Sequence, residues 1–335
     1  MKYDFPKLDL HYHLDGSMDP ETTFRLAQER NITLPVNSAQ ELAQFFKDTA
    51  DCDDVGQYLA RFDMLTAILQ DKPALTETTY ASIKNIADML DYVEIRFAPQ
   101  LHTHKGISQK DAIDAVLEGK RKAEKDFPQI KVKIILCMMI SFKDNEKENQ
   151  ETARLFEQYY GNEVVGLDLA GFEDSVPMDN YAHLFESAKS KGLNLTIHGG
   201  DNGLATNPAK VIGWGAKRVG HGHHCYYDKE TMQKVIDTKT ALEICLSSNI
   251  QCKTEPSFSQ HPAKKLLDSG VKVTLCTDNM ILANTTIEKE YDIAMQQVGF
   301  SYNDLVQCAI NGFEASFMSE QEKQPYLEKL AKAFK

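Results

Sequence analysis

The sequence has no Cys-x-x-Cys pair and no apolar run long enough to span a bilayer, and its opening residues, MKYDFPKLDL, lack the apolar core of a signal peptide. Its seven cysteines are scattered and odd in number, which is typical of reduced thiols in a cytoplasmic protein rather than of a disulfide framework. Cys137, Cys245 and Cys276 lie inside apolar runs, so we expect them in the core and not at a metal. We therefore predict a cytoplasmic protein without a membrane partner.

An excess of basic residues is also lacking. The 37 Lys and Arg stand against 49 Asp and Glu, and the resulting net charge of −12 argues against nucleic acid as a partner. The length of 335 residues exceeds that of an average domain but is ordinary for a (β/α)8 barrel. The composition gives no indication of the oligomeric state.

Eight short apolar runs alternate with helix-type stretches along the chain, most of them separated by roughly 20–35 residues, which is room for one helix and its loops. Runs that are apolar on both faces are typical of a parallel sheet covered by helices. The pattern predicts an α/β fold, a single domain over residues 1–335 in which parallel strands close into a (β/α)8 barrel. The expected strands are Leu8–His13, Tyr92–Ala98, Val132–Met138, Val164–Leu169, Asn194–His198, Arg218–Gly220, Ala241–Cys245 and Lys272–Cys276.

The spacing is different only between the first two strands, where residues 17–90 contain several helix-type stretches. An insertion at this point of a barrel lies over the ends of the strands that carry catalytic residues, so it can act as a lid. Ordinary packing of these helices against the barrel explains the same pattern.

The opening strand ends in the segment LDLHYHLDGS, which contains His11 and His13. Side chains at i and i+2 of a strand point to the same face, so both imidazoles are aimed in one direction. Two neutral imidazoles on one rigid strand form half of a metal site. The glycine turn that follows places them at the carboxyl edge of the expected barrel.

Three more polar residues follow other expected strands in the same way. His198 ends the run LNLTIH, His221 follows RVG, and Asp278 follows VTLCT. Because barrel strands converge at one end, these residues can meet His11 and His13 there. The imidazoles of His11, His13 and His198 with the carboxylate of Asp278 form a mixed nitrogen and oxygen site that suits zinc, which lowers the pKa of a bound water.

A second His-x-His pair, His102 and His104, lies beyond Pro99 and next to lysine and glycine. We predict that both are solvated loop residues and not metal ligands. Glu94, Arg96 and Asp168 are charges on strands that are expected to be buried, so they need partners. They either orient the ligands from behind or form internal ion pairs.

The segments LDLHYHLDGS, YVEIRFAPQ, VVGLDLAGFE, IHGGD, RVGHGHH, LEICLSSN and TLCTDN occur in an order and spacing that resemble those of the adenosine deaminases, members of the metal-dependent amidohydrolase superfamily. The resemblance covers nearly the whole chain. It implies a barrel, one bound zinc ion per chain, and hydrolytic removal of ammonia from C6 of a purine. It also implies that His11, His13, His198 and Asp278 are the zinc ligands.

The resemblance assigns further roles. His221 matches the histidine that orients the attacking hydroxide and stabilises the developing charge. Asp15 matches a residue that hydrogen-bonds the ribose, and a carboxylate there repels a 5′-phosphate, which favours a nucleoside over a nucleotide. Gly171 matches a glycine whose backbone N–H meets the purine. Leu59 and Phe62 resemble the apolar wall of the family's lid, although ordinary helix packing explains them equally well.

Two positions depart from the commonest family pattern. Asp201 stands where the family usually has a glutamate that transfers a proton to the purine N1, and its side chain is shorter by one methylene, about 1.5 Å. The adjacent glycines, Gly199 and Gly200, offer a backbone that can move closer and offset the difference. Asn279 stands where many members have an aspartate that donates to N7, and an amide always carries donor hydrogens.

The sequence therefore predicts a zinc-dependent enzyme that converts adenosine and 2′-deoxyadenosine to inosine and ammonia. One alternative is a deaminase of adenine or of an N6-substituted purine. A second alternative, suggested by Asp201, is a zinc-dependent protein that binds nucleosides with weakened catalysis. A purely structural role on a barrel scaffold fits least, because so many strand ends carry ligand-type residues.

Overall fold

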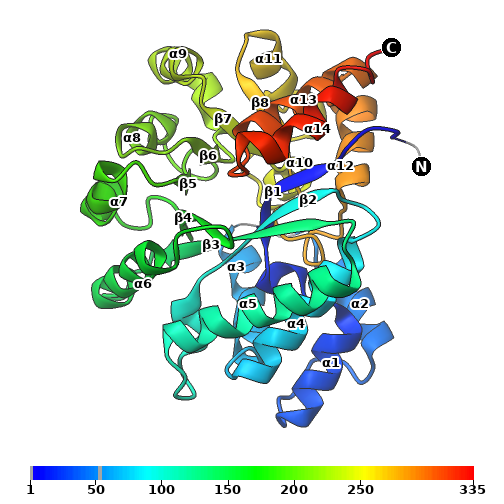
Figure 1. Cartoon of the computed structure of the whole chain (residues 1–335), viewed down its shortest axis with the longest axis vertical. Coiled ribbons are helices and arrows are strands. Elements are labelled where there is room, and N and C mark those ends of the chain that lie inside the picture. The colour runs from blue at the N-terminus through cyan, green and yellow to red at the C-terminus, as the bar shows by residue number, and fades with distance from the viewer. Residues whose placement is uncertain (1–2, 52–54) are drawn as a thin grey trace.

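The computed structural model describes residues 3–51 and 55–335, without the side chains of residues 55–60. Eight parallel strands lie at its centre, and helices surround them (Figure 1). All eight strands predicted from the sequence are confirmed, with bounds that differ by at most two residues. The strands are β1 (Leu8–His13), β2 (Tyr92–Phe97), β3 (Lys131–Met139), β4 (Val164–Ala170), β5 (Thr196–His198), β6 (Arg218–Gly220), β7 (Ala241–Ile244) and β8 (Lys272–Leu275).

The strands form two four-stranded sheets, β1 to β4 and β5 to β8, each in sequence order. Two isolated parallel bridges join the sheets, Leu167 with Leu195 on one side and Tyr12 with Asp278 on the other. At the second seam the N–H of Asp278 donates to the carbonyl of His11 at 2.7 Å, and the N–H of His13 donates to the carbonyl of Asp278 at 2.8 Å. The strands therefore close into a barrel, as predicted.

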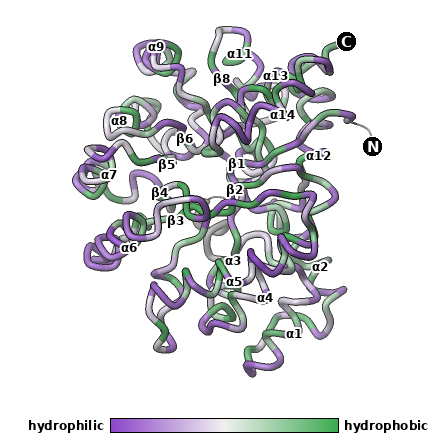
Figure 2. Tube along the Cα trace, viewed as in Figure 1, coloured by the Kyte–Doolittle hydropathy of each residue, from purple (hydrophilic) through white to green (hydrophobic). Residues whose placement is uncertain are grey.

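Helices connect successive strands and cover the outside of the barrel. Figure 2 shows hydrophobic residues along the central strands and many hydrophilic residues on outlying helices such as α6. The α-helices are α1 (Pro20–Glu29), α2 (Ala39–Asp48), α3 (Val55–Ile68), α4 (Lys72–Ile86), α5 (Gln109–Asp126), α6 (Glu146–Tyr159), α7 (Glu186–Ser190), α8 (Asn207–Gly213), α9 (Lys229–Thr238), α10 (Leu246–Gln251), α11 (Ala263–Asp268), α12 (Ile287–Ile293), α13 (Tyr302–Ala315) and α14 (Glu320–Leu330).

The predicted insertion between the first two strands consists of α1 to α4. Side chains of α3, among them Phe62, line the large pocket described below, so part of the insertion borders that pocket. The function of the insertion as a lid stays a prediction. In the described ranges, no helix combines the length and the apolar character that crossing a membrane requires.

The cysteines of the described ranges (137, 225, 245, 252, 276 and 308) are buried and form no disulfides with one another. Cys245 and Cys276 lie in the apolar core as predicted, whereas Cys137 is buried and also lines the pocket.

Candidate metal centre and substrate pocket

Four predicted ligands lie together at the carboxyl ends of the strands. His11 and His13 come from β1, His198 ends β5, and Asp278 follows β8. The Nε2 atoms of His11 and His13 are 3.3 Å apart, and Asp278 Oδ1 lies 3.6 Å from the first and 3.4 Å from the second. The rings of His11 and His198 have centroids 4.5 Å apart. Ligand atoms around a tetrahedral zinc ion are about 3.3 Å apart, so this spacing fits one.

Carboxylates behind the cluster determine which histidine ring nitrogens are available to bind a metal ion. His11 donates its Nδ1 hydrogen to Glu243 Oε2 at 2.9 Å, and His198 donates its own to Asp168 Oδ1 at 3.1 Å. Arg96 lies between the two carboxylates and donates to both at 2.7 Å. Each Nε2 is consequently left without a hydrogen and faces the cluster, as a metal ligand requires.

These carboxylates belong to a larger buried network inside the barrel. Arg218 donates from Nε to Glu243 Oε1 at 2.6 Å and is also paired with Glu94. Although burial acts in the opposite direction, the charges of Arg96 and Arg218 lower the pKa of Glu243 to about 2. Both roles left open by the sequence occur: Asp168 contacts the predicted ligand His198, and internal ion pairs join Glu94 to Arg218 and Arg96 to Asp168 and Glu243.

A pocket of about 640 Å³ opens over the cluster, a size that suits a small organic ligand. Most of the predicted site residues line it: His13, Asp15, Phe62, Gly171, His198, Asp201, His221, Asp278 and Asn279. His11 lies just behind it and is fully buried. Leu59 belongs to α3, but its side chain lies outside the described residues.

Two glycines in the pocket region leave no room for a side chain. At Gly171, where φ is +122°, a Cβ atom would lie 2.9 Å from the carbonyl oxygen of Ile140. At Gly16 a Cβ atom would lie 1.8 Å from Asn279 Oδ1, so the Asn279 side chain packs directly on this backbone. Both positions favour glycine, because a side chain would displace part of the pocket wall.

Backbone strain marks two of the predicted site residues. His221 has φ of 56° and Asp278 has φ of 62°, in the left-handed region that residues other than glycine rarely adopt. Such conformations persist where the surrounding structure holds them, and they are frequent at functional sites. Here they occur at the ends of two strands whose side chains enter the same pocket.

Asp201 lies in the loop after β5, held by a carboxylate from the neighbouring loop. The N–H groups of Gly200 and Asp201 each donate to Glu173 at 2.8 Å. Burial raises the pKa of Glu173. Asp201 Oδ1 is 3.5 Å from Nδ1 of His221. The two residues that the resemblance links to proton transfer and charge stabilisation are therefore neighbours.

The sequence interpretation assigned no role to two residues of the site. Ser248 donates to Asp278 Oδ2 at 2.6 Å, and Asn249 donates from Nδ2 to Asp201 Oδ1 at 2.7 Å. Both belong to the segment LEICLSSN, and the only available signal was their place after an expected strand.

One prediction was wrong. His102 is fully buried instead of solvated, with Nδ1 3.0 Å from the carbonyl oxygen of Leu69 and its ring beside Phe97. A short 3₁₀ helix, residues Pro99–His102, turns the chain inward after β2 and buries the side chain. The prediction that His104 is exposed is confirmed.

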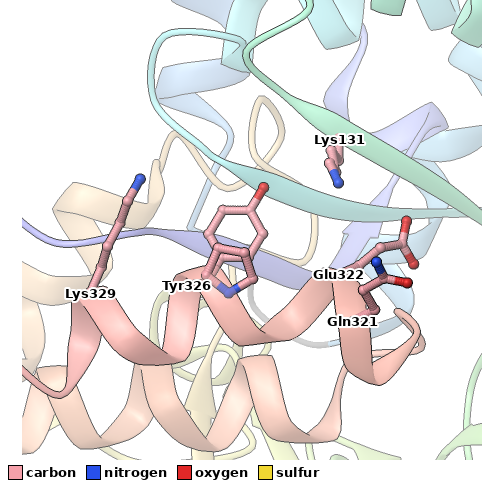
Figure 3. A pocket seen from close by; sticks show the side chains of 6 residues that line it. Lys131, Gln321, Glu322, Tyr326 and Lys329 are labelled. Carbon is pink, nitrogen blue, oxygen red and sulfur yellow. The ribbon is translucent and has the colours of Figure 1, made fainter.

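A smaller hollow of about 370 Å³ lies at the other end of the barrel. Lys131, the first residue of β3, and several residues of α14 line it, and Figure 3 shows the side chains of Lys131, Glu322 and Lys329 near the Tyr326 ring. Barrel enzymes carry their active sites at the carboxyl ends of the strands, so the pocket over the histidines is the candidate site.

Comparisons with known proteins identify the family of the chain. The family model described as adenosine deaminase matches residues 6–333. The chain is 36% identical over 324 residues to an adenosine deaminase of Haemophilus ducreyi, covering 96% of this chain and 94% of that protein. It is 35% identical over 333 residues to an adenosine deaminase of Streptococcus mutans, covering 99% and 94%.

Solved structures share the fold at lower identity. An adenine deaminase from Arthrobacter aurescens superposes with a TM-score of 0.89 at 23% identity, covering 98% of this chain and 99% of that chain. An N6-mAMP deaminase from Arabidopsis gives a TM-score of 0.84 at 24% identity, covering 98% of each chain. An amidohydrolase from Burkholderia ambifaria with bound Zn gives 0.85 at 21% identity, covering 98% and 90%.

Proposed function

Because the chain belongs to the adenosine deaminase family, we propose that it converts adenosine and 2′-deoxyadenosine to inosine and ammonia by hydrolysis. The observation that carries this proposal is the meeting of three histidines and one aspartate beside the Asp201–His221 pair, in a pocket large enough for a nucleoside. Membership of the family by itself supports the more general activity, that of a metal-dependent hydrolase that removes an amino group.

We assign one zinc ion per chain to His11, His13, His198 and Asp278. The donor set fits, because imidazole nitrogens and a carboxylate converge and the Nδ1 hydrogens of two of these rings are directed to carboxylates. When bound, zinc acts as a Lewis acid and makes a water molecule nucleophilic at neutral pH.

The remaining steps fall to the protein's own side chains. Asp201 delivers a proton to N1 of the purine as the water adds to C6. His221, next to it, orients the water and stabilises the charge that develops on its oxygen. Asn279 donates to N7, the backbone N–H of Gly171 meets the purine ring, and Asp15 accepts a hydrogen bond from the ribose.

Asp15 favours a nucleoside among the possible substrates. It is buried at the wall of the pocket, where a carboxylate can accept from a ribose hydroxyl and repels a phosphate. The alternatives are adenine and N6-substituted purines, the substrate classes named for two of the structural neighbours. A nucleoside-binding protein with weakened catalysis is the remaining alternative, and it rests on the short side chain of Asp201.

The test is ammonia release by protein of known metal content, before and after chelation and after zinc is restored. Adenosine, 2′-deoxyadenosine, adenine, N6-methyladenosine and AMP are compared as substrates. We expect turnover of the first two that follows one bound zinc per chain. Turnover confined to adenine or an N6-substituted purine contradicts the substrate assignment, and bound zinc with nucleoside binding but no turnover supports the binding protein.

A further inference from the structure

A buried asparagine connects the two residues to which the proposed function assigns proton transfer and charge stabilisation. Asn249 lies in α10, five residues after Ile244, the last residue of β7, and it is fully buried. Its Nδ2 donates to Asp201 Oδ1 at 2.7 Å and lies 3.1 Å from Nδ1 of His221. One amide group thus contacts both residues.

The neighbours of Asn249 fix the direction in which its amide points. The N–H of Ala263 donates to Nδ1 of His261 at 3.1 Å, so the hydrogen of this neutral ring is on Nε2. Nε2 of His261 in turn lies 3.1 Å from Asn249 Oδ1 and donates to it. Burial lowers the pKa of His261 to about 3, which keeps the ring neutral. If the Asn249 amide were reversed, its oxygen would face the Asp201 carboxylate, and two acceptors would stand opposite each other.

The orientation of the Asn249 amide determines the hydrogen bonds of both His221 and Asp201. The Nδ1 atom of His221 faces an N–H donor, so it acts as an acceptor and the ring hydrogen is on Nε2. Oδ1 of Asp201 accepts from Asn249, and Thr254 Oγ1 lies 3.3 Å from the same oxygen. Oδ2 is therefore the oxygen that remains for a substrate, and within the described part of the chain it accepts from the Asn202 amide at 3.2 Å.

We propose that Asn249 is a positioning residue for deamination: it holds the short carboxylate of Asp201 in place and keeps the ring hydrogen of His221 on Nε2. The proposal rests on the proposed function for the roles of Asp201 and His221. It offers a reason why an aspartate serves where the family usually has a glutamate, because a fixed amide restricts the carboxylate to one orientation. A misplacement of about 1 Å costs on the order of a hundredfold in rate.

The first experiment compares Asn249→Ala and Asn249→Asp with the control Gln251→Ala in the zinc-loaded enzyme. Gln251 belongs to the same helix, but its side chain donates to the carbonyl of Ala283 at 2.9 Å instead of to Asp201. We expect kcat to fall roughly 10- to 100-fold in both Asn249 variants with KM changed less than about threefold. Gln251→Ala should keep kcat within about threefold. A loss in Asn249→Ala no larger than in the control overturns the proposal.

A second readout does not depend on turnover. Nitrogen NMR of ring-labelled histidine distinguishes the two neutral tautomers, and a His221→Gln spectrum identifies the His221 signals. We expect a single Nε2–H tautomer in the unsubstituted protein and a mixture in Asn249→Ala, with unchanged zinc content. If the tautomer is the same in both proteins, Asn249 does not set it. Failure of the enzyme to deaminate any tested purine contradicts the proposed function instead, and leaves this readout intact.

Discussion

At the scale of single residues, the loop that carries the short side chain of Asp201 is held in place by its neighbours. The backbone N–H groups of Gly200 and Asp201 are tied to Glu173, and Gly200 has φ of 79° with Pro208 against it. The backbone of this loop is therefore held in place by Glu173 and packed against Pro208. Substitution of Asp201 tests whether Gly199 and Gly200 place the backbone so that it offsets the shorter side chain.

We expect Asp201→Glu to lower kcat by roughly tenfold, because the longer side chain no longer meets the Asn249 amide at the present position. Steady-state kinetics on adenosine with zinc-loaded protein measures this. An unchanged kcat means that the reach of this carboxylate does not affect the rate, and a higher kcat means that the short side chain limits it.

Asn279→Asp should retain activity at low pH and lose it as the pH rises. An aspartate donates to N7 only while protonated, so the donor disappears as the pH passes the carboxyl pKa, whereas the amide donates at every pH. The profile of kcat/KM against pH for both proteins is the measurement. Two profiles of the same shape contradict the role of Asn279 as a donor to N7.

The residues at strand ends could be predicted from the sequence, whereas their supporting partners could not. His11, His198 and Asp278 each follow an apolar run, and convergence of barrel strands brings such residues together. Glu243 lies within an expected strand and Asn249 follows it, but their positions do not reveal their partners, which are distant in the sequence and brought near only by the closed barrel. Prediction of those contacts requires the folded barrel.

At the scale of elements, the strands were predictable because they are buried on both faces and read as nearly continuous apolar runs. The short 3₁₀ helix of residues Pro99–His102 was not predictable in this way. Proline, lysine and glycine near His102 indicated a solvated loop, but contacts with Leu69 and Phe97 bury the ring. Tertiary packing thus decided the environment of this side chain.

The burial of His102 should make stability depend on pH. Burial lowers its pKa from 6.5 to about 4, so between these values the unfolded chain binds a proton that the folded protein does not. Stability therefore falls as the pH decreases from 6.5, by about 2 kcal/mol at pH 5 for this group. His102→Asn keeps a donor for the Leu69 carbonyl and removes the titration.

Denaturant unfolding of both proteins at pH 7 and pH 5 measures the effect. We expect the unsubstituted protein to lose about 2 kcal/mol more than His102→Asn over this interval. Other histidines contribute equally in both proteins and cancel in the comparison. Equal losses would show that His102 is protonated in the folded state as readily as in the unfolded chain.

At the scale of the whole molecule, buried charges join the two halves of the barrel. Glu243 of β7 contacts Arg218 of β6, Arg96 of β2 and His11 of β1, so a single carboxylate links strands from both sheets. Removing one partner from a buried ion network leaves charges unpaired in a medium that solvates them poorly. The same carboxylate orients a proposed zinc ligand.

Glu243→Gln should therefore lower the free energy of unfolding by about 3–5 kcal/mol and weaken zinc binding roughly 10- to 100-fold. The matched control is Glu118→Gln, which removes one charge from an exposed pair with Lys122 and should change stability by less than about 1 kcal/mol. Chemical unfolding and competition with a zinc chelator are the measurements. A variant with the stability and zinc affinity of the control would show that the network is not needed for either.

The seam at which β1 meets the segment after β8 also sets an order of events during protein synthesis. Asp9 and Thr277, which are hydrogen-bonded across this seam, are 268 residues apart in the chain. At ordinary translation speeds of about 5–20 residues per second, the ribosome produces the first two histidines roughly 15–50 s before Asp278. Until then a growing chain offers a metal only part of its ligands. The complete set of proposed metal ligands therefore exists only after the eighth strand has been made, and any metal bound earlier is held without the carboxylate of Asp278.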